Sequence, residues 1–296
     1  MLSAVSPGVY IGLGAALLAA ILFGSGDYGA AILGKKMSPL MFTSSNYLIE
    51  IPVLFLLLLI SGDHGKTSTN LSMFGLGTLG TIAFMILVFA LTKGHVSVVM
   101  ALAGLFAILV PAIVSIVIGE NSSILVWAGF AAAAIAIVCI TQARDAEDHE
   151  DAIAHAKGLK ISIILGIIAG VLTGVYFASL GKIDSPIFAK LFYLQLSGFI
   201  IALVYFALKR PSFESFRKYF VLMVLIALAY QFGQMLFPFA TTKTSLVITT
   251  IIVNLYPGVT IMWAKIFSHE KTSRIQNAGF VVAAIGVVLV SIGAGS

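Results

Sequence analysis

The sequence predicts an all-α polytopic membrane protein, with ten transmembrane helices arranged as two inverted five-helix repeats around a central cavity. Three observations lead to this fold. Of 296 residues, 60% are hydrophobic and 10% are charged, whereas about a quarter of the residues of an ordinary soluble chain are charged. The apolar residues form ten runs of transmembrane length, and motifs of the first half return in the second half.

A helix that crosses the hydrocarbon core needs roughly 20 apolar residues. By this measure the ten helices are expected at 9–32, 39–61, 71–91, 97–118, 124–141, 159–181, 186–208, 217–239, 245–267 and 274–293. The connections are short, apart from 61–70 and a charged stretch at 142–158. We predict that the latter is a solvated linker, with or without an extra helical turn. The expected domains are therefore a first repeat at 1–141, the linker at 142–158 and a second repeat at 159–296.

The repeat is clearest at the predicted helix boundaries, where identical residues are not explained by apolar composition. Leu33, Gly34, Lys35, Ser38 and Pro39 return 147 residues later as Leu180, Gly181, Lys182, Ser185 and Pro186. Thr92, Lys93 and Glu120 return 150 residues later as Thr242, Lys243 and Glu270. Five helices make an odd number of crossings, so the second copy enters the membrane from the opposite side, as in inverted repeats.

Several classes of chemistry find no support in the sequence. The single cysteine, Cys139, allows neither an intramolecular disulfide nor a cysteine metal cluster. There is no phosphate-binding P-loop, no His-Glu-x-x-His motif and no nucleophile with a partner base. We therefore expect no enzymatic activity, no cofactor and no bound metal.

The basic residues are better explained by the membrane than by a nucleic-acid partner. They give a pI near 9.3, but almost all lie in short breaks between apolar runs, where they act as topology signals and contact lipid headgroups. Thirteen of the 17 Lys and Arg residues follow the odd-numbered helices and three follow the even-numbered ones. The positive-inside rule then places both termini outside.

The boundary motifs carry a family resemblance over nearly the whole chain. Phe23-Gly24-Ser25-Gly26 near the end of the first helix, the Ser38-Pro39 start of the second, and Glu120 and Glu270 before Ala-Gly-Phe helices resemble the EamA-type branch of the drug/metabolite transporter superfamily. This resemblance implies a ten-helix carrier whose cavity is built mainly from helices 1, 3, 4, 6, 8 and 9, with both termini inside. Phe23 stands where the family often has Trp, and Asn46 lies near a position often held by Arg.

Ionisable residues within apolar runs are the first candidates for a site, because they are expensive in a membrane and usually face a cavity or a partner. Glu50 is nearly central in the second helix. Asp27 lies in a glycine-dense stretch, where the helix either unwinds beside a cavity, as in discontinuous carrier helices, or ends early at the headgroups. Lys190 is about one turn into the seventh helix, from which its side chain can extend to the membrane surface.

Uncharged polar residues near the middle of the helices form a second group. Each is expected either to contact a solute or to bridge helices through hydrogen bonds. The group comprises Asn46, Tyr176, Tyr193, Gln231, Gln234, Asn254 and Tyr256. Pro111 and Pro257 are candidate hinges or kinks, because proline removes one helical hydrogen bond.

From these residues we predict a secondary active transporter that works by alternating access, with proton coupling. Carboxylates, tyrosine rings and amides suit a small amine-bearing metabolite, either an amino acid or a quaternary amine. The alternatives are a facilitative exporter of a nucleobase or sugar, a channel, or a lipid scramblase. The expected partners are this solute, membrane lipid and protons, without nucleic acid. We expect a monomer in a prokaryotic plasma membrane.

Overall fold

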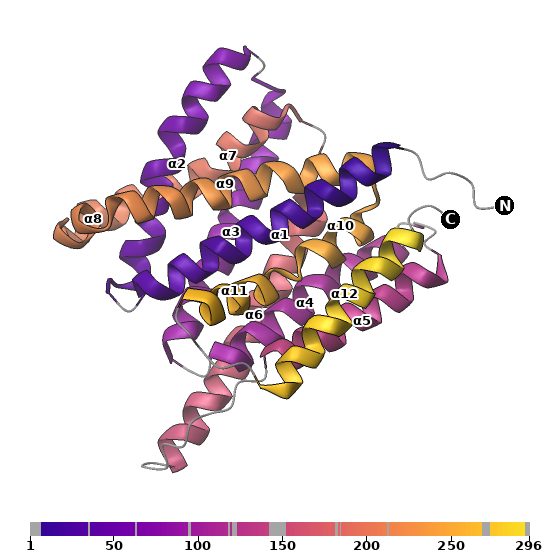
Figure 1. Ribbon diagram of the computed structural model, residues 1–296. Coiled ribbons are helices and arrows are strands. Elements are labelled where there is room, and N and C mark those ends of the chain that lie inside the picture. The colour runs from indigo at the N-terminus through magenta and orange to yellow at the C-terminus, as the bar shows by residue number, and fades with distance from the viewer. Residues whose placement is uncertain are drawn as a thin grey trace.

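A computed structural model describes residues 7–34, 36–62, 64–93, 96–117, 119, 123–141, 152–180, 183, 185–211, 213–267 and 273–293 (Figure 1). Within these ranges every regular element is a helix. The first half of the chain contains α1 (Pro7–Gly34), α2 (Pro39–Ser61), α3 (Thr67–Lys93), α4 (Val96–Val117) and α5 (Ile124–Thr141). The second half contains α6 (Ala152–Leu180), α7 (Ile187–Lys209), α8 (Glu214–Lys218), α9 (Phe220–Lys243), α10 (Leu246–Val253), α11 (Tyr256–Phe267) and α12 (Arg274–Gly293).

The observed helices confirm the all-α class but not a simple set of ten. α2, α5 and α12 have the predicted bounds. The expected helix at 245–267 is divided into α10 and α11, and a short α8 precedes α9. By length and composition, seven helical segments of the described chain can cross a membrane, and three shorter apolar helices lie in α4, α5 and α12.

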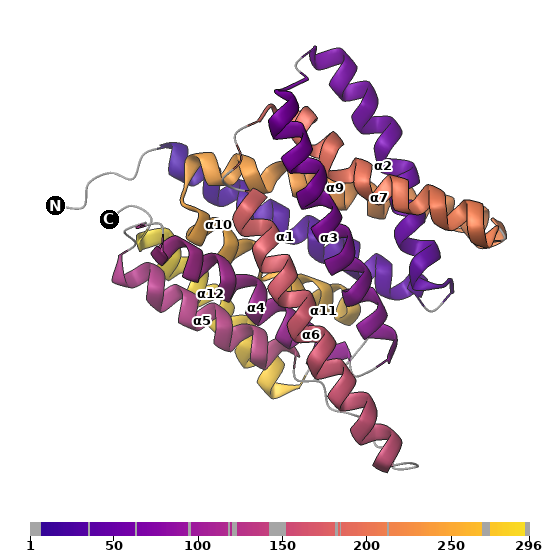
Figure 2. The same cartoon turned by 180° about the vertical axis from the view of Figure 1, so that it is seen from behind.

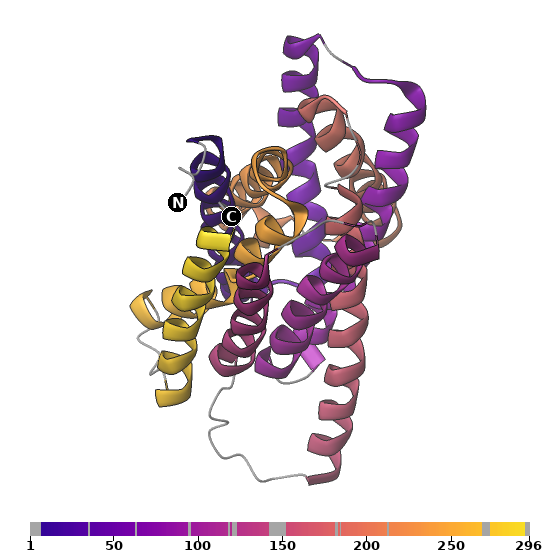
Figure 3. The ribbon, with the colours of Figure 1, turned by 90° about the vertical axis from the view of Figure 1, so that its right-hand side faces the viewer.

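The predicted linker is only partly described. Residues 142–151 lie outside the described part of the chain, as do Glu120 and Glu270, which marked the repeat boundaries. Residues 152–158, which we assigned to the linker, form the beginning of α6. This end of α6 extends past the neighbouring helices (Figure 3).

Side chains at the helix ends explain several of these bounds. The Ser38 hydroxyl accepts a hydrogen bond from the Met41 N–H at 3.2 Å, and Pro39 occupies the first helical position of α2. Ser245 caps α10 in the same way, through the Ile248 N–H at 3.2 Å. Such caps satisfy N–H groups that have no partner within the helix.

The break between α10 and α11 occurs immediately before Pro257. Proline has no N–H to donate to the Val253 carbonyl four residues earlier. The next N–H, that of Gly258, bonds the Leu255 carbonyl at 2.9 Å, so the Asn254 carbonyl also loses its usual helical donor. The helical hydrogen-bond pattern is therefore interrupted beside Pro257; a hinge role for this residue stays a prediction. Pro111, in contrast, lies within α4, which continues as one helix.

The two halves are interleaved in a two-fold pattern. α1 packs against α9, α10 and α11 of the second half, and α6 packs correspondingly against α3 and α4 of the first half. α2 pairs with its counterpart α7, and α5 pairs with α12. In Figures 1 and 2, the α5–α12 pair lies at the opposite end of the molecule from α2 and α7. Each half therefore depends on the other for its packing.

The glycine-dense stretch of α1 remains helical, so both readings of it were wrong: α1 neither unwinds nor ends near Asp27. These glycines permit close helix contacts instead. A Cβ on Gly24 would lie 2.6 Å from the Tyr256 carbonyl oxygen, and one on Gly29 would lie 2.5 Å from Ile226. Gly170 and Gly174 of α6 face α4 in the same manner, with added Cβ atoms 2.7 Å from Ala103 and Val110.

Candidate functional site

A pocket lies where the two halves meet, with a volume of about 150 Å³. Its lining comes from α1, α2, α3, α6, α7, α9 and α11. The family resemblance implied a lining mainly from the predicted helices 1, 3, 4, 6, 8 and 9, which correspond to α1, α3, α4, α6, α9 and the α10–α11 pair. In addition α2 and α7 contribute, and no described residue of α4 is in the lining. α2 packs against α9 and α7 packs against α3, so one face of each helix adjoins the pocket.

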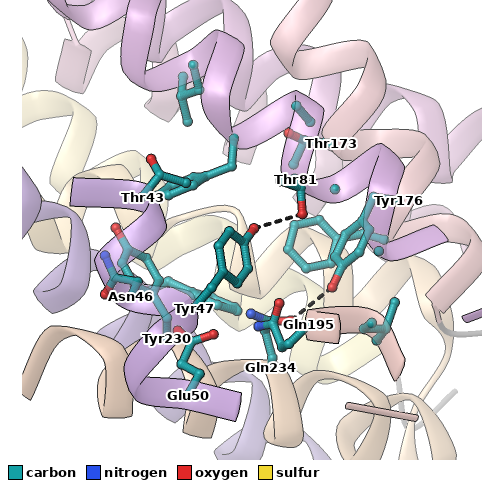
Figure 4. Close-up of a pocket in the computed structure, with 18 of the residues that line it drawn as sticks. Thr43, Asn46, Tyr47, Glu50, Thr81, Thr173, Tyr176, Gln195, Tyr230 and Gln234 are labelled. Atoms are coloured by element: carbon teal, nitrogen blue, oxygen red, sulfur yellow. Dashed lines mark hydrogen bonds between the residues drawn. The ribbon is translucent and has the colours of Figure 1, made fainter. Parts of the chain in front are cut away.

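One face of α2 supplies much of the polar lining. Thr43, Asn46, Tyr47 and Glu50 all line the pocket, and their spacing of three, four and seven residues puts them on one side of a helix. Figure 4 shows Asn46, Tyr47 and Glu50 together on α2, with Gln195 and Gln234 across from them. The cluster is therefore set by helical periodicity and by the burial of this face.

Each of three tyrosines lies against a glycine of a neighbouring helix. A Cβ added to Gly80 of α3 would lie 2.7 Å from the Tyr176 ring, and one on Gly26 of α1 would lie 3.0 Å from the Tyr230 ring. A Cβ on Gly198 of α7 would overlap the Tyr47 ring. The absent side chains thus provide the room in which these rings lie.

The three tyrosine hydroxyls also have defined partners. The Tyr230 hydroxyl donates to Asp27 Oδ1 at 2.6 Å, and the Tyr176 hydroxyl donates to Gln234 Oε1 at 2.9 Å. The Tyr47 and Thr81 hydroxyls are 2.9 Å apart. Together these bonds connect α1 to α9, α6 to α9 and α2 to α3, so they hold the rings at fixed positions around the pocket.

The acidic groups of the pocket differ in their partners. Asp27 is held by Tyr230. Glu50 is only 5% exposed, and its Oε2 atom has no hydrogen-bond partner among the described residues. The neighbouring Asn46 is 4% exposed, and its Oδ1 atom also has no hydrogen-bond partner among the described residues. Buried polar atoms normally have partners, so Glu50 and Asn46 present open acceptors to whatever occupies the pocket.

The lining combines acidic side chains with aromatic surface. Asp27 and Glu50 are its acidic residues, and the described lining contains no Lys, Arg or His. Its aromatic members are Phe23, Tyr47, Phe84, Tyr176, Phe177, Tyr230 and Tyr256. Phe23 contacts the rings of Phe177, Tyr230 and Tyr256 at centroid distances of 6.1, 6.4 and 6.5 Å. Such a wall stabilises a cation through both carboxylates and ring faces.

The structure brings six of the ten predicted polar and ionisable candidates to the pocket: Asp27, Asn46, Glu50, Tyr176, Gln234 and Tyr256. Among the described residues, Lys190, Tyr193, Gln231 and Asn254 are not part of its lining. Lys190 is 6% exposed, so its side chain is buried and does not extend to the surface as we expected. The roles of all ten in binding or coupling stay predictions.

Sequence reasoning missed Thr43, Tyr47, Thr81 and Thr173 as lining residues. Thr43 and Tyr47 could have been found from their helical spacing relative to Asn46 and Glu50. No comparable signal identifies Thr81 and Thr173, because a single threonine in a helix often only bonds its own backbone.

Comparisons with known proteins agree with this arrangement of two halves. The model of a family described as "EamA-like transporter family" matches residues 10–142 and again residues 160–292. A solved structure described as "Crystal structure of protein" has a TM-score of 0.78 and 14% sequence identity, and the match covers 98% of each chain. At this identity the likeness concerns the fold alone. A search of curated proteins found no match.

Proposed function

The chain belongs to the EamA-like transporter family, and from this premise we propose that it is a secondary active transporter of a small amine-bearing solute, driven by proton exchange. The observation that carries this proposal is the pocket between the halves, with two carboxylates and no basic side chain in its described lining. Family membership makes the protein a multi-pass membrane transporter of the drug/metabolite superfamily. The solute, the coupling and the mechanism are our proposals.

The charge of the pocket favours a cationic solute. An unpaired carboxylate in a buried, weakly polar site is expensive, so it is neutralised by a proton or by a bound cation. Seven aromatic rings around the same volume add cation–π stabilisation. We therefore propose that the solute and protons compete for the carboxylates, which couples their movements.

Between the two amine classes, the pocket favours an organic cation such as a quaternary amine over an amino acid. The carboxylate of an amino acid would need a positive partner, or several donors, to offset the nearby Asp27 and Glu50. The described lining offers only neutral donors, including Gln195 and Gln234. A cation with a neutral polar end would instead place its charge at Glu50 and its polar end at these amides.

For alternating access we propose ten crossings in two inverted repeats. The seven long spans and the three shorter apolar helices together make ten crossings, with α10 and α11 sharing one. The two-fold packing of α1 on α9 and of α6 on α3 supports this arrangement. In such carriers the two repeats rock against each other around a central site.

Transport by the purified protein in liposomes tests this proposal. With an outward proton gradient, we expect saturable accumulation of radiolabelled choline, weak accumulation of alanine, and none of glucose or uracil. Collapsing the gradient with a protonophore should abolish accumulation while leaving choline exchange intact. Uptake of glucose or uracil without choline would overturn the cation proposal. Unsaturable, gradient-independent flux of ions or lipid would indicate a channel or scramblase instead.

Gly80→Ala should lower choline affinity, because its Cβ would lie 2.7 Å from Tyr176 and push that ring toward the pocket. Overpacking of this kind costs about 1–3 kcal/mol, so we expect affinity to fall by about tenfold in equilibrium binding. Tyr176→Phe, which keeps the ring but loses the bond to Gln234, separates the two contributions and should have a smaller effect. Unchanged affinity in Gly80→Ala would contradict a positioning role for this glycine.

A further inference from the structure

The turn between α7 and α9 has the features of a membrane surface. α7 ends at Lys209, Arg210 caps it with a left-handed backbone (φ 42°), and the short α8 follows. Four phenylalanines form a continuous series through this turn: centroid distances are 5.0 Å for Phe206–Phe213, 6.1 Å for Phe213–Phe216 and 5.6 Å for Phe216–Phe220. Tyr219 lies between α8 and α9, and amphipathic tyrosine rings concentrate at the lipid–water boundary. The four phenylalanines add apolar surface beside it.

Positive charge is concentrated at the same turn. Residues 209–218 contain Lys209, Arg210, Arg217 and Lys218 but one acidic residue, Glu214. Lys36, from the turn between α1 and α2, approaches this group: its Nζ lies 4.9 Å from the centroid of the Tyr219 ring, and Lys218 Nζ lies 5.6 Å from the same centroid. Two ammonium groups thus lie beside one aromatic ring, and a bound anion would neutralise part of this positive charge.

A hollow of about 470 Å³ lies beside these side chains and is amphipathic. Its lining has a basic part before α9, formed by Arg217, Lys218 and Tyr219, and an apolar part at the start of α9, formed by Phe220, Val221, Leu222 and Leu225. Val221 is 72% exposed and Leu225 is 59% exposed. A free inorganic anion would use only the basic part, whereas the apolar part matches an acyl chain.

We propose that this hollow binds one anionic phospholipid, with its phosphate among Lys36, Arg217 and Lys218 and an acyl chain along Val221 and Leu225. Such a lipid would connect the end of α1 to the start of α9. These two helices carry Asp27 and Tyr230, and between the turn and that pair Leu33 of α1 packs with Met223 and Ile226 of α9. The lipid therefore stabilises the helix pair that forms one wall of the pocket.

The experiment measures the thermal midpoint of the full chain in a neutral detergent, titrated with dioctanoyl phosphatidylglycerol or dioctanoyl phosphatidylcholine. We expect saturable stabilisation by phosphatidylglycerol and much weaker stabilisation by phosphatidylcholine. The triple variant K36Q/R217Q/K218Q should need at least tenfold more phosphatidylglycerol, since each basic side chain near anionic lipid contributes about fivefold. All three residues are exposed, so the variant should still fold.

Two further variants keep the test specific. K66Q/K265Q/R274Q removes the same charge from exposed positions elsewhere and should bind phosphatidylglycerol like the wild type; an equal loss in this control would overturn the site. V221S/L225S should weaken phosphatidylglycerol binding severalfold while keeping every basic residue. If this variant binds normally and inorganic phosphate or glycerol phosphate stabilises the wild type equally well, the site takes a small anion and the lipid proposal is wrong.

Discussion

Replacing Glu50 with Gln should abolish proton-driven accumulation of an organic cation. Glu50 is buried in the middle of α2, lines the pocket and has an oxygen without a described hydrogen-bond partner. Removing one partner of a buried charge contact typically costs about 2–5 kcal/mol, and we therefore expect choline affinity to fall at least about thirtyfold. The amide is nearly isosteric, so the fold should be retained.

The pH dependence of binding gives this prediction a second readout. If protons and solute compete for the Glu50 carboxylate, the wild type binds choline more weakly as pH falls, because the protonated form no longer attracts the cation. In Glu50→Gln this dependence should be largely lost, and what remains reports on Asp27. The measurement is equilibrium binding of radiolabelled choline between pH 5 and pH 8.

Glu214→Gln is the matched control, because Glu214 is an exposed carboxylate on α8, outside the pocket lining. It should transport like the wild type. If Glu50→Gln kept both the affinity and the pH dependence of the wild type, Glu50 would have no part in the site. If it kept the affinity but lost accumulation in liposomes, Glu50 would serve proton coupling without contacting the solute.

Gly77→Ala should destabilise the protein more than any other glycine-to-alanine change in α3. A Cβ at this position would overlap the backbone carbonyl of Leu194 in α7. A backbone carbonyl cannot rotate away as a side chain can, so α3 and α7 would have to separate. We expect a loss of about 1–3 kcal/mol, measured as the free energy of unfolding in mild detergent, together with reduced transport.

Gly75→Ala, two residues earlier in the same helix, is the control. Nothing lies within 4 Å of a Cβ built on Gly75, and alanine favours helix over glycine by about 0.8–1 kcal/mol. This variant should therefore be as stable as the wild type or slightly more stable. Equal stability of the two variants would show that the close approach of α3 and α7 is not needed for folding.

Helix positions could be predicted well because they depend on local composition. The bounds of α2 and its central Glu50 follow from a long apolar run that begins at a Ser-Pro cap. The glycines of α1 show the limit of this reasoning. Small residues favour both an unwound helix and close helix packing, so the sequence does not distinguish the two. The contacts of Gly24 with α11 and of Gly29 with α9 show that these glycines serve packing.

The features of the candidate site likewise divide into those predictable from the sequence and those that depend on tertiary packing. That α2 would present Asn46 and Glu50 together is a property of helical spacing and could be anticipated. The partner of Asp27 could not, because Tyr230 is 203 residues away and the contact exists only when α1 packs on α9. The prediction for Lys190 was wrong for a related reason. Its position one turn into the helix suggested that the side chain extends to the membrane surface, but neighbouring residues bury it.

The sequence by itself determined the membrane environment, the duplication, the family and the approximate positions of most helices, because these depend on composition and on spacing along one chain. Only the tertiary structure decided which helices enclose the pocket, which tyrosine holds Asp27, and that no described Lys, Arg or His lies in the lining with the two carboxylates. The physical reason is that each half packs its first helix against the other half. Contacts between such distant segments arise from the fit of one helix surface to another, which no local pattern specifies.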